Sequence, residues 1–96
     1  MNIQALMKQA QNMQRDMLKV KEEIDNTIFD EENELVKVKI NGKKEIIDIK
    51  ISNSLQLDDM DMLQDMLIIA LNNAFKKVDK MTEEKMGKFS NIPGLF

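Results

Sequence analysis

Three basic side chains recur along the first quarter of the chain at spacings that place them on one face of a helix. Lys8, Arg15 and Lys19 are separated by seven and four residues, so at about 100° per residue they align with one another and with Asn12. Lys and Arg side chains along a helix face can contact successive phosphates and displace their counterions. The alternative is the ordinary solvated face of an amphipathic helix. These basic side chains could therefore bind a polyanion through electrostatic contacts.

A second group of lysines lies in the last third of the chain. Lys76, Lys77 and Lys80 fall close together, and Lys85 and Lys88 follow. Lysines near the C-terminus of a helix are also expected from the helix macrodipole alone. Two cationic groups on projecting helices of one molecule nevertheless favour a phosphate-rich partner. The candidate phosphate-binding residues are Lys8, Arg15, Lys19, Lys76, Lys77 and Lys80.

Catalytic and metal-binding side chains are scarce in this sequence. There is no His, Cys, Trp or Tyr, which removes the commonest general base, nucleophile and metal ligands, although Asp, Glu and Lys chemistry is not formally excluded. Asp58, Asp59, Asp61 and Asp65 lack the central Gly and terminal Glu of a calcium loop, and acids at a helix start complement its dipole. We therefore predict an interaction protein rather than an enzyme, with no cofactor, metal or small-molecule substrate.

The overall charge and the local charges point to different partners. The 96 residues carry a formal net charge of −3, and the sequence pI of about 4.9 taken alone argues against nucleic acid. The charge is nevertheless distributed in blocks: +3 over residues 1–21, −7 over 22–34, +3 over 35–50, −4 over 51–65 and +2 over 66–96. The local charge of each segment, rather than the net charge of the chain, is therefore expected to determine which partner binds.

Length and hydropathy predict one small domain without a membrane segment. A lone domain of 96 residues buries only a modest fraction of its surface, and such chains often complete their core by oligomerising. The longest apolar run, residues 66–71, is too short for a membrane span or a signal-peptide core. A cytoplasmic location is expected.

The first helix is predicted over residues 2–25, followed by a short edge strand at 27–30. Six apolar residues alternate at spacings of four and three, which is the seam of a helix that lies along another helix. They are Leu6, Ala10, Met13, Met17, Val20 and Ile24. Asp25, Asn26 and Thr27 then break the periodicity, because such residues bond their own backbone in turns.

Between Leu35 and Ile51 apolar residues recur at every second position, which is typical of strands. The dipeptide Asn41-Gly42 interrupts the alternation and is a strong hairpin signal. Cross-strand apolar pairing favours a four-residue loop over 41–44, which would pair Val38 with Ile47 and Val36 with Ile49. The predicted sheet side of the core is Val36, Val38, Ile40, Ile47, Ile49 and Ile51.

A second helix is predicted from Asp58 to Lys85. Its first half has a broad apolar face that suits packing on a sheet. Beyond Phe75 only Val78 and Met81 continue this face, so the far half is expected to project beyond the sheet along one partner helix. Residues 88–96, which include the one Pro, are expected to form a non-helical tail.

Six segments, taken in order, form a recognisable pattern: Leu6–Gln14, Leu35–Gly42, Ile49–Ile51, Met62–Leu67, Ala70–Ala74 and Ile92–Phe96. This order resembles the YbaB/EbfC family of small bacterial nucleoid-associated proteins. The resemblance covers nearly the whole chain, and the order of the motifs is more specific than any one of them, because an Asn-Gly hairpin is common.

The resemblance implies an α+β fold in which a helix, a three-stranded antiparallel sheet and a helix form one domain over residues 1–96. It also implies a homodimer whose helical arms project like tweezers, binding of double-stranded DNA with modest sequence preference, and a role in the nucleoid or in gene expression. From the residues themselves we expect contacts to phosphates with little base readout, since nothing here resembles a recognition helix.

The competing hypothesis is a protein-interaction module. The chain contains nine methionines, and flexible, polarizable Met side chains can line promiscuous binding grooves, although most of these Met residues lie at ordinary seam or core spacing. In this hypothesis the Met-rich seams of the two arms clamp a client helix or polypeptide, as a chaperone-like module would. Its binding would be insensitive to salt.

Overall fold

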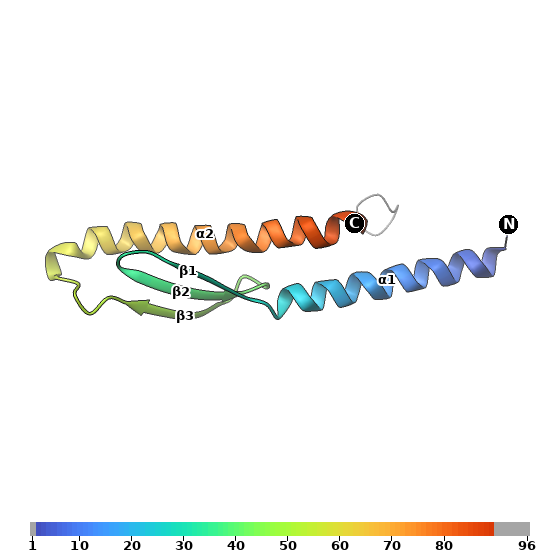
Figure 1. Cartoon of the computed structure of the whole chain (residues 1–96), viewed down its shortest axis with the longest axis horizontal. Helices are drawn as coiled ribbons and strands as arrows, with labels where there is room; N and C mark the ends of the chain where they lie inside the picture. The colour runs from blue at the N-terminus through green and yellow to red at the C-terminus, as the bar shows by residue number, and fades with distance from the viewer. Residues whose placement is uncertain (1, 90–96) are drawn as a thin grey trace.

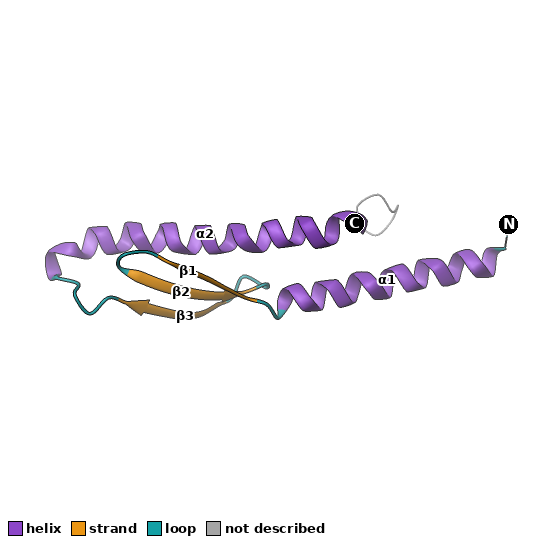
Figure 2. Ribbon diagram, in the orientation of Figure 1, coloured by secondary structure: helices purple, strands orange, loops and turns teal. Residues whose placement is uncertain are grey.

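The chain folds into a helix, a three-stranded antiparallel sheet and a second long helix, as predicted (Figure 1). The computed structural model describes residues 2–89. The elements are α1 (Ile3–Asp25), β1 (Ile28–Glu32), β2 (Val36–Asn41), β3 (Ile46–Ile51) and α2 (Met60–Met86), with short 3₁₀ helices at Leu57–Asp59 and Gly87–Phe89. The molecule measures 71 × 18 × 14 Å. It is long because α1 continues past the end of α2 (Figure 2).

Local side-chain hydrogen bonds set the ends of α1. The Asn2 side-chain oxygen accepts a hydrogen bond from the backbone N–H of Gln4 at 2.9 Å, which satisfies one of the free donors of the first turn. At the other end the Thr27 hydroxyl donates to the Glu23 carbonyl at 2.7 Å. The helix therefore begins and ends within one residue of the predicted bounds.

A single asparagine joins the β1–β2 turn to α2. The Asn33 side-chain oxygen accepts from the backbone N–H groups of Leu35 and Val36 at 3.1 and 3.2 Å. Its amide nitrogen donates to the Met66 carbonyl on α2 at 3.0 Å. Such an Asx turn closes the connection locally, and the third bond fixes the distance between the sheet and the helix above it.

The β2–β3 register differs by two residues from the predicted one. Val38 lies opposite Ile49 and Val36 opposite Ile51, instead of opposite Ile47 and Ile49. One residue of the shift comes from the loop, because Ile40 pairs with Ile46 across five connecting residues. The other comes from a bulge in β3, which leaves Ile47 without a partner on β2. Sequence alternation does not reveal a bulge, because the apolar pattern is the same on both sides of it.

The predicted core is correct for β2 and wrong for β3. Val36, Val38 and Ile40 are buried, whereas Ile47, Ile49 and Ile51 are exposed. The physical reason is that α2 packs on β1 and β2 and leaves β3 uncovered (Figure 1). The buried cluster between helix and sheet consists of Phe29, Val36, Val38, Ile40, Ala70, Ala74 and Val78.

The last turns of α1 pack against the last turns of α2, beside the hairpin loop. Ile24 and Phe89 are buried there, and Lys85 forms an ion pair with Glu23. Along the α1 seam, burial decreases toward the N-terminus: Ile24 is buried, Val20, Met17 and Met13 are half-buried, and Ala10 and Leu6 are exposed. The predicted helix–helix seam is therefore occupied within this chain only over its C-terminal part.

The predicted non-helical tail, residues 88–96, is wrong for its first two residues. Lys88 and Phe89 belong to the 3₁₀ helix Gly87–Phe89, and the buried Phe89 ring anchors it. Residues 90–96 lie outside the described part of the chain.

Candidate nucleic-acid interface

The first cationic group lies on a helix that stands free of the sheet. We call residues 3–19 of α1 the arm, the part of this helix that points away from the sheet (Figure 1). Lys8, Arg15 and Lys19 lie on it and are exposed. With 1.5 Å of rise per residue these side chains span about 16 Å along the helix axis. Within the described chain none of the three forms an ion pair, and Arg15 donates to the neighbouring Asn12 side chain. The arm therefore presents three positive charges without an ion-pair partner among residues 2–89; with its one carboxylate, Asp16, its net charge is +2 (three cations less one anion).

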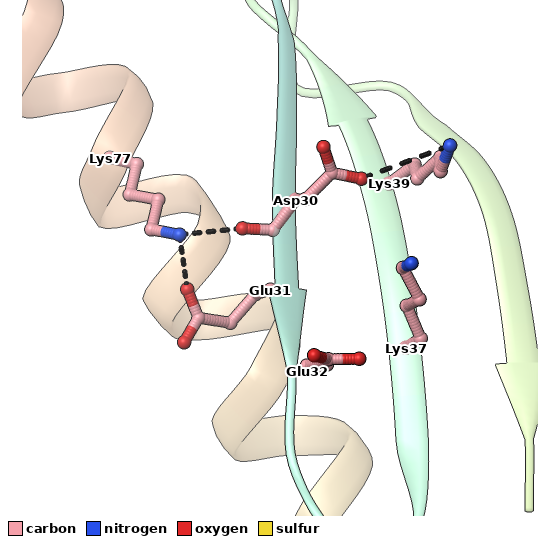
Figure 3. Close-up of a pocket in the computed structure, with 6 residues that line it drawn as sticks. All are labelled: Asp30, Glu31, Glu32, Lys37, Lys39 and Lys77. Atoms are coloured by element: carbon pink, nitrogen blue, oxygen red, sulfur yellow. Dashed lines mark hydrogen bonds and ion pairs between the residues drawn. The ribbon is translucent and has the colours of Figure 1, made fainter.

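The way α2 packs on the sheet gives the lysines of the second cationic group different surroundings. The ammonium group of Lys77 lies 2.6 Å from the Glu31 carboxylate and donates to the Asp30 carbonyl at 2.5 Å, so this side chain turns toward β1 (Figure 3). Lys76 and Lys80 are exposed and have no ion-pair partner among residues 2–89. Of the three candidates on α2, two remain available for an anionic ligand without breaking an ion pair.

An acidic zone separates the two groups. Glu22, Glu23, Glu83 and Glu84 lie around the α1–α2 junction, where Lys85 pairs with Glu23. Lys19 lies four residues before Glu23 in α1, and Lys76 lies nine residues before Lys85 in α2, which runs antiparallel to α1. At 1.5 Å of rise per residue, Lys19 and Lys76 are therefore about 20 Å apart along the helix axes. This separation exceeds the Debye length of about 8 Å at physiological salt. Lys76 is therefore electrostatically separate from the arm, whereas Lys85 and Lys88 lie at the junction beside the base of the arm.

A charged hollow lies around β1 and β2, but its charges balance. It is lined by Asp30, Glu31, Glu32, Lys37, Lys39 and Lys77 (Figure 3). Lys39 approaches Asp30 at 4.0 Å, and Lys77 approaches Glu31. With three carboxylates against three ammonium groups, this hollow offers no net attraction for a phosphate.

Neither a metal-holding group of side chains nor a membrane-spanning helix is found among residues 2–89. This part of the chain contains no group of three or more acidic side chains placed to hold a metal ion. Neither described helix has a stretch that is apolar and long enough to cross a bilayer.

Besides Lys77–Glu31, the structure adds two long-range ion pairs that sequence reasoning missed. Lys85 contacts Glu23 across 62 positions, and Lys44 of the hairpin loop lies 2.8 Å from Asp79 of α2. Both are exposed pairs, which stabilise a fold by about 1 kcal/mol or less each. No local pattern in the sequence indicates them, because the partners meet only after the helices have packed.

Comparison with known proteins gives the same fold and a consistent set of relatives. Residues 1–92 match the profile of the YbaB/EbfC DNA-binding family. A nucleoid-associated protein of Ligilactobacillus salivarius is 44% identical, over 99% of this chain and 95% of the relative. One from Chloroflexus aurantiacus is 41% identical over the full length of both chains. The crystal structure of an uncharacterized protein, HP0035 from Helicobacter pylori, superposes with a TM-score of 0.72 over 93% of this chain and 97% of that one, at 24% identity.

Proposed function

Because this chain belongs to the YbaB/EbfC DNA-binding family, we propose that it binds double-stranded DNA in the nucleoid through the cationic arm. The observation that carries the proposal is the position of Lys8, Arg15 and Lys19. They lie on one exposed face of a helix that extends beyond the acidic junction, and no described carboxylate pairs with them. A negative net charge of the whole chain is compatible with this, since the acid-rich segments lie outside the arm, the nearest beginning at Glu22.

The mechanism is neutralisation of phosphates rather than reading of bases. A single helix face with one guanidinium and two ammonium groups can follow a DNA backbone, and each contact releases condensed counterions. We propose that the protein acts as a homodimer, so that two arms engage one duplex, with Lys76 and Lys80 as secondary contacts. Low sequence specificity follows from such binding, since phosphate contacts carry no sequence information. We also propose that the protein contributes to nucleoid organisation and gene regulation.

The salt dependence of DNA binding tests the proposal. If the three arm cations of both protomers each neutralise one phosphate, the logarithm of the binding constant should fall with the logarithm of salt concentration with a slope of about −5. The measurement is fluorescence anisotropy of a labelled random-sequence duplex at several salt concentrations. A folded protein that shows no binding even at low salt would contradict the proposal.

The ion pair of Lys77 predicts a difference between two adjacent lysines. Lys76→Gln should make the salt slope shallower by up to about 2, because it removes one secondary phosphate contact from each protomer of the homodimer. Lys77→Gln should leave DNA affinity within about twofold, since that ammonium group is already neutralised by Glu31. Anisotropy titrations of both variants and the unaltered protein at several salt concentrations make the comparison. A larger effect of the Lys77 change would mean that the ion pair opens when DNA binds.

The exposed apolar residues of the arm favour one alternative, a module that clamps a client polypeptide. Leu6 and Met7 are exposed near the end of the arm, on or beside a seam that no described helix covers there. Such a module would bind with little salt dependence. Met13→Asp or Met17→Asp would abolish binding of the client by such a module, whereas removal of the cations would not.

A further inference from the structure

The last cation of the arm is followed by two carboxylates on the same helix. Glu22 and Glu23 come three and four residues after Lys19, and side chains at these spacings are neighbours on a helix surface, where Lys and Glu attract each other. A lysine held by a carboxylate is less available to a phosphate. Among residues 2–89, however, Lys19 forms no ion pair. Contacts from outside α1 explain why it stays free.

Glu23 is held by the other helix. Its carboxylate forms an ion pair with Lys85 in the last turn of α2, where the two helices pack together; the Glu23 and Lys85 side chains are 57% and 37% exposed. Lys88 borders the same junction, but its ammonium group lies over the Phe89 ring, 5.1 Å from the ring centroid. Lys85 is therefore the described cation that holds this carboxylate.

Glu22 faces a different flank of α1. It lines a hollow together with Lys21 and with Lys43 of the hairpin loop. This hollow lies where the loop meets the end of α1, since the Gly42 N–H donates to the Asp25 carbonyl there. Two lysines other than Lys19 therefore share the surroundings of the Glu22 carboxylate.

We infer that Lys85 is a positioning residue for DNA binding: by holding Glu23 on the side of α2, it leaves Lys19 free to contact a phosphate. The inference rests on the proposed binding of DNA by the arm, and it assigns a role to a lysine that does not itself contact the phosphates. Four residues along a helix turn it by about 400°, so Glu23 lies within about 40° of the direction of Lys19 and about 6 Å along the axis. This distance is shorter than the Debye length of about 8 Å, so an unpaired Glu23 would attract Lys19 or repel a phosphate bound to it.

A lysine that contacts phosphates directly would behave differently from one that acts through Glu23. Removal of a direct contact would cost the same affinity whether or not Glu23 were present, whereas a lysine that acts through Glu23 matters only while that carboxylate is there. Direct contact is also disfavoured because the Lys85 ammonium group is already neutralised within the chain. Removing both members of the ion pair therefore distinguishes the two roles.

The DNA affinities of four variants, measured by anisotropy at several salt concentrations, test the inference. Lys85→Gln should weaken binding about fivefold and make the salt slope shallower by up to about 2, because the freed Glu23 occupies Lys19 in each protomer. Lys85→Gln combined with Glu23→Gln, which has the net charge of the unaltered protein, should bind within about twofold of it. Lys85→Arg keeps the ion pair and should also bind within about twofold.

A lysine of the sheet provides the control for the loss of one positive charge. Lys37 is exposed and forms no ion pair within the described chain, so Lys37→Gln should change affinity by less than about twofold. Circular dichroism should show retained structure in every variant, since both members of the Glu23–Lys85 pair are partly exposed. A double variant that binds no better than Lys85→Gln, or an equal loss in Lys37→Gln, would overturn the inference.

A measurement without DNA separates this inference from the proposed function. Acylation of Lys19 by an N-hydroxysuccinimide ester, followed by peptide mass spectrometry, should be about twofold slower in Lys85→Gln than in the unaltered protein, because pairing with Glu23 favours the protonated, unreactive amine. The double variant should react at the unaltered rate. Equal reactivity of Lys19 in all three proteins would overturn the inference. If Lys19 slows as expected but the unaltered protein does not bind DNA, the proposed function fails and the placement of Glu23 by Lys85 stands.

Discussion

Reversing the charge of the three arm residues together, as Lys8→Glu, Arg15→Glu and Lys19→Glu, is expected to weaken DNA binding at least about 100-fold. Each substitution replaces a phosphate contact by a repulsion, and a homodimer carries the change twice. The fold should survive, because all three side chains are exposed and none forms an ion pair within residues 2–89. Anisotropy at low salt, with circular dichroism and molecular mass as checks on the fold, measures the effect.

A control with the same change of net charge shows whether the position matters. Lys37, Lys43 and Lys50 are exposed on the sheet and its hairpin loop, and no ion pair within the described chain involves them. Their combined reversal to Glu alters the net charge by the same amount away from the arm. Affinity should then fall far less than for the arm variant. Equal losses in the two variants would show that total charge, rather than the arm, governs binding.

The largest expected effect on stability comes from Gly42→Ala, which should lower the free energy of unfolding by about 3 kcal/mol. Here the hairpin loop touches the end of α1, and the Gly42 N–H donates to the Asp25 carbonyl at 3.3 Å. An added Cβ would clash with the carbonyl group of Ile24 and lie 2.9 Å from the Asp25 Cα. These are backbone atoms, so relief requires moving the whole helix end. Urea unfolding followed by circular dichroism gives the value.

Gly87 provides the contrast within the same chain. An added Cβ there meets nothing within 4 Å, and the residue has helical dihedral angles, with φ of −57° and ψ of −34°. Gly87→Ala should therefore leave stability unchanged or raise it by up to about 1 kcal/mol, because Ala loses less conformational entropy in a helix. If both glycine variants unfold alike, the close contact between the hairpin and α1 is not what requires Gly42.

Local patterns predicted the elements and the arm well. The 3–4 spacing of apolar residues placed α1 within one residue of its bounds, and the period of two located both strands of the hairpin. The cation row followed from the same helical period, since side chains seven and four residues apart share a face in any α-helix. The candidate residues Lys8, Arg15 and Lys19 are on one exposed face for this reason, and their contact with DNA stays a prediction.

What depended on packing was not visible in the sequence. The apolar alternation of β3 equals that of β2, yet only β2 is buried, because one helix is too narrow to cover three strands. Lys77 resembles Lys76 in sequence, yet its position beside Glu31 is decided by how α2 rotates on the sheet. The chain by itself thus determined the periods, the turns and the face that carries charge. The tertiary structure decided which apolar face is covered and which cations are neutralised, since both depend on contacts between residues distant in sequence.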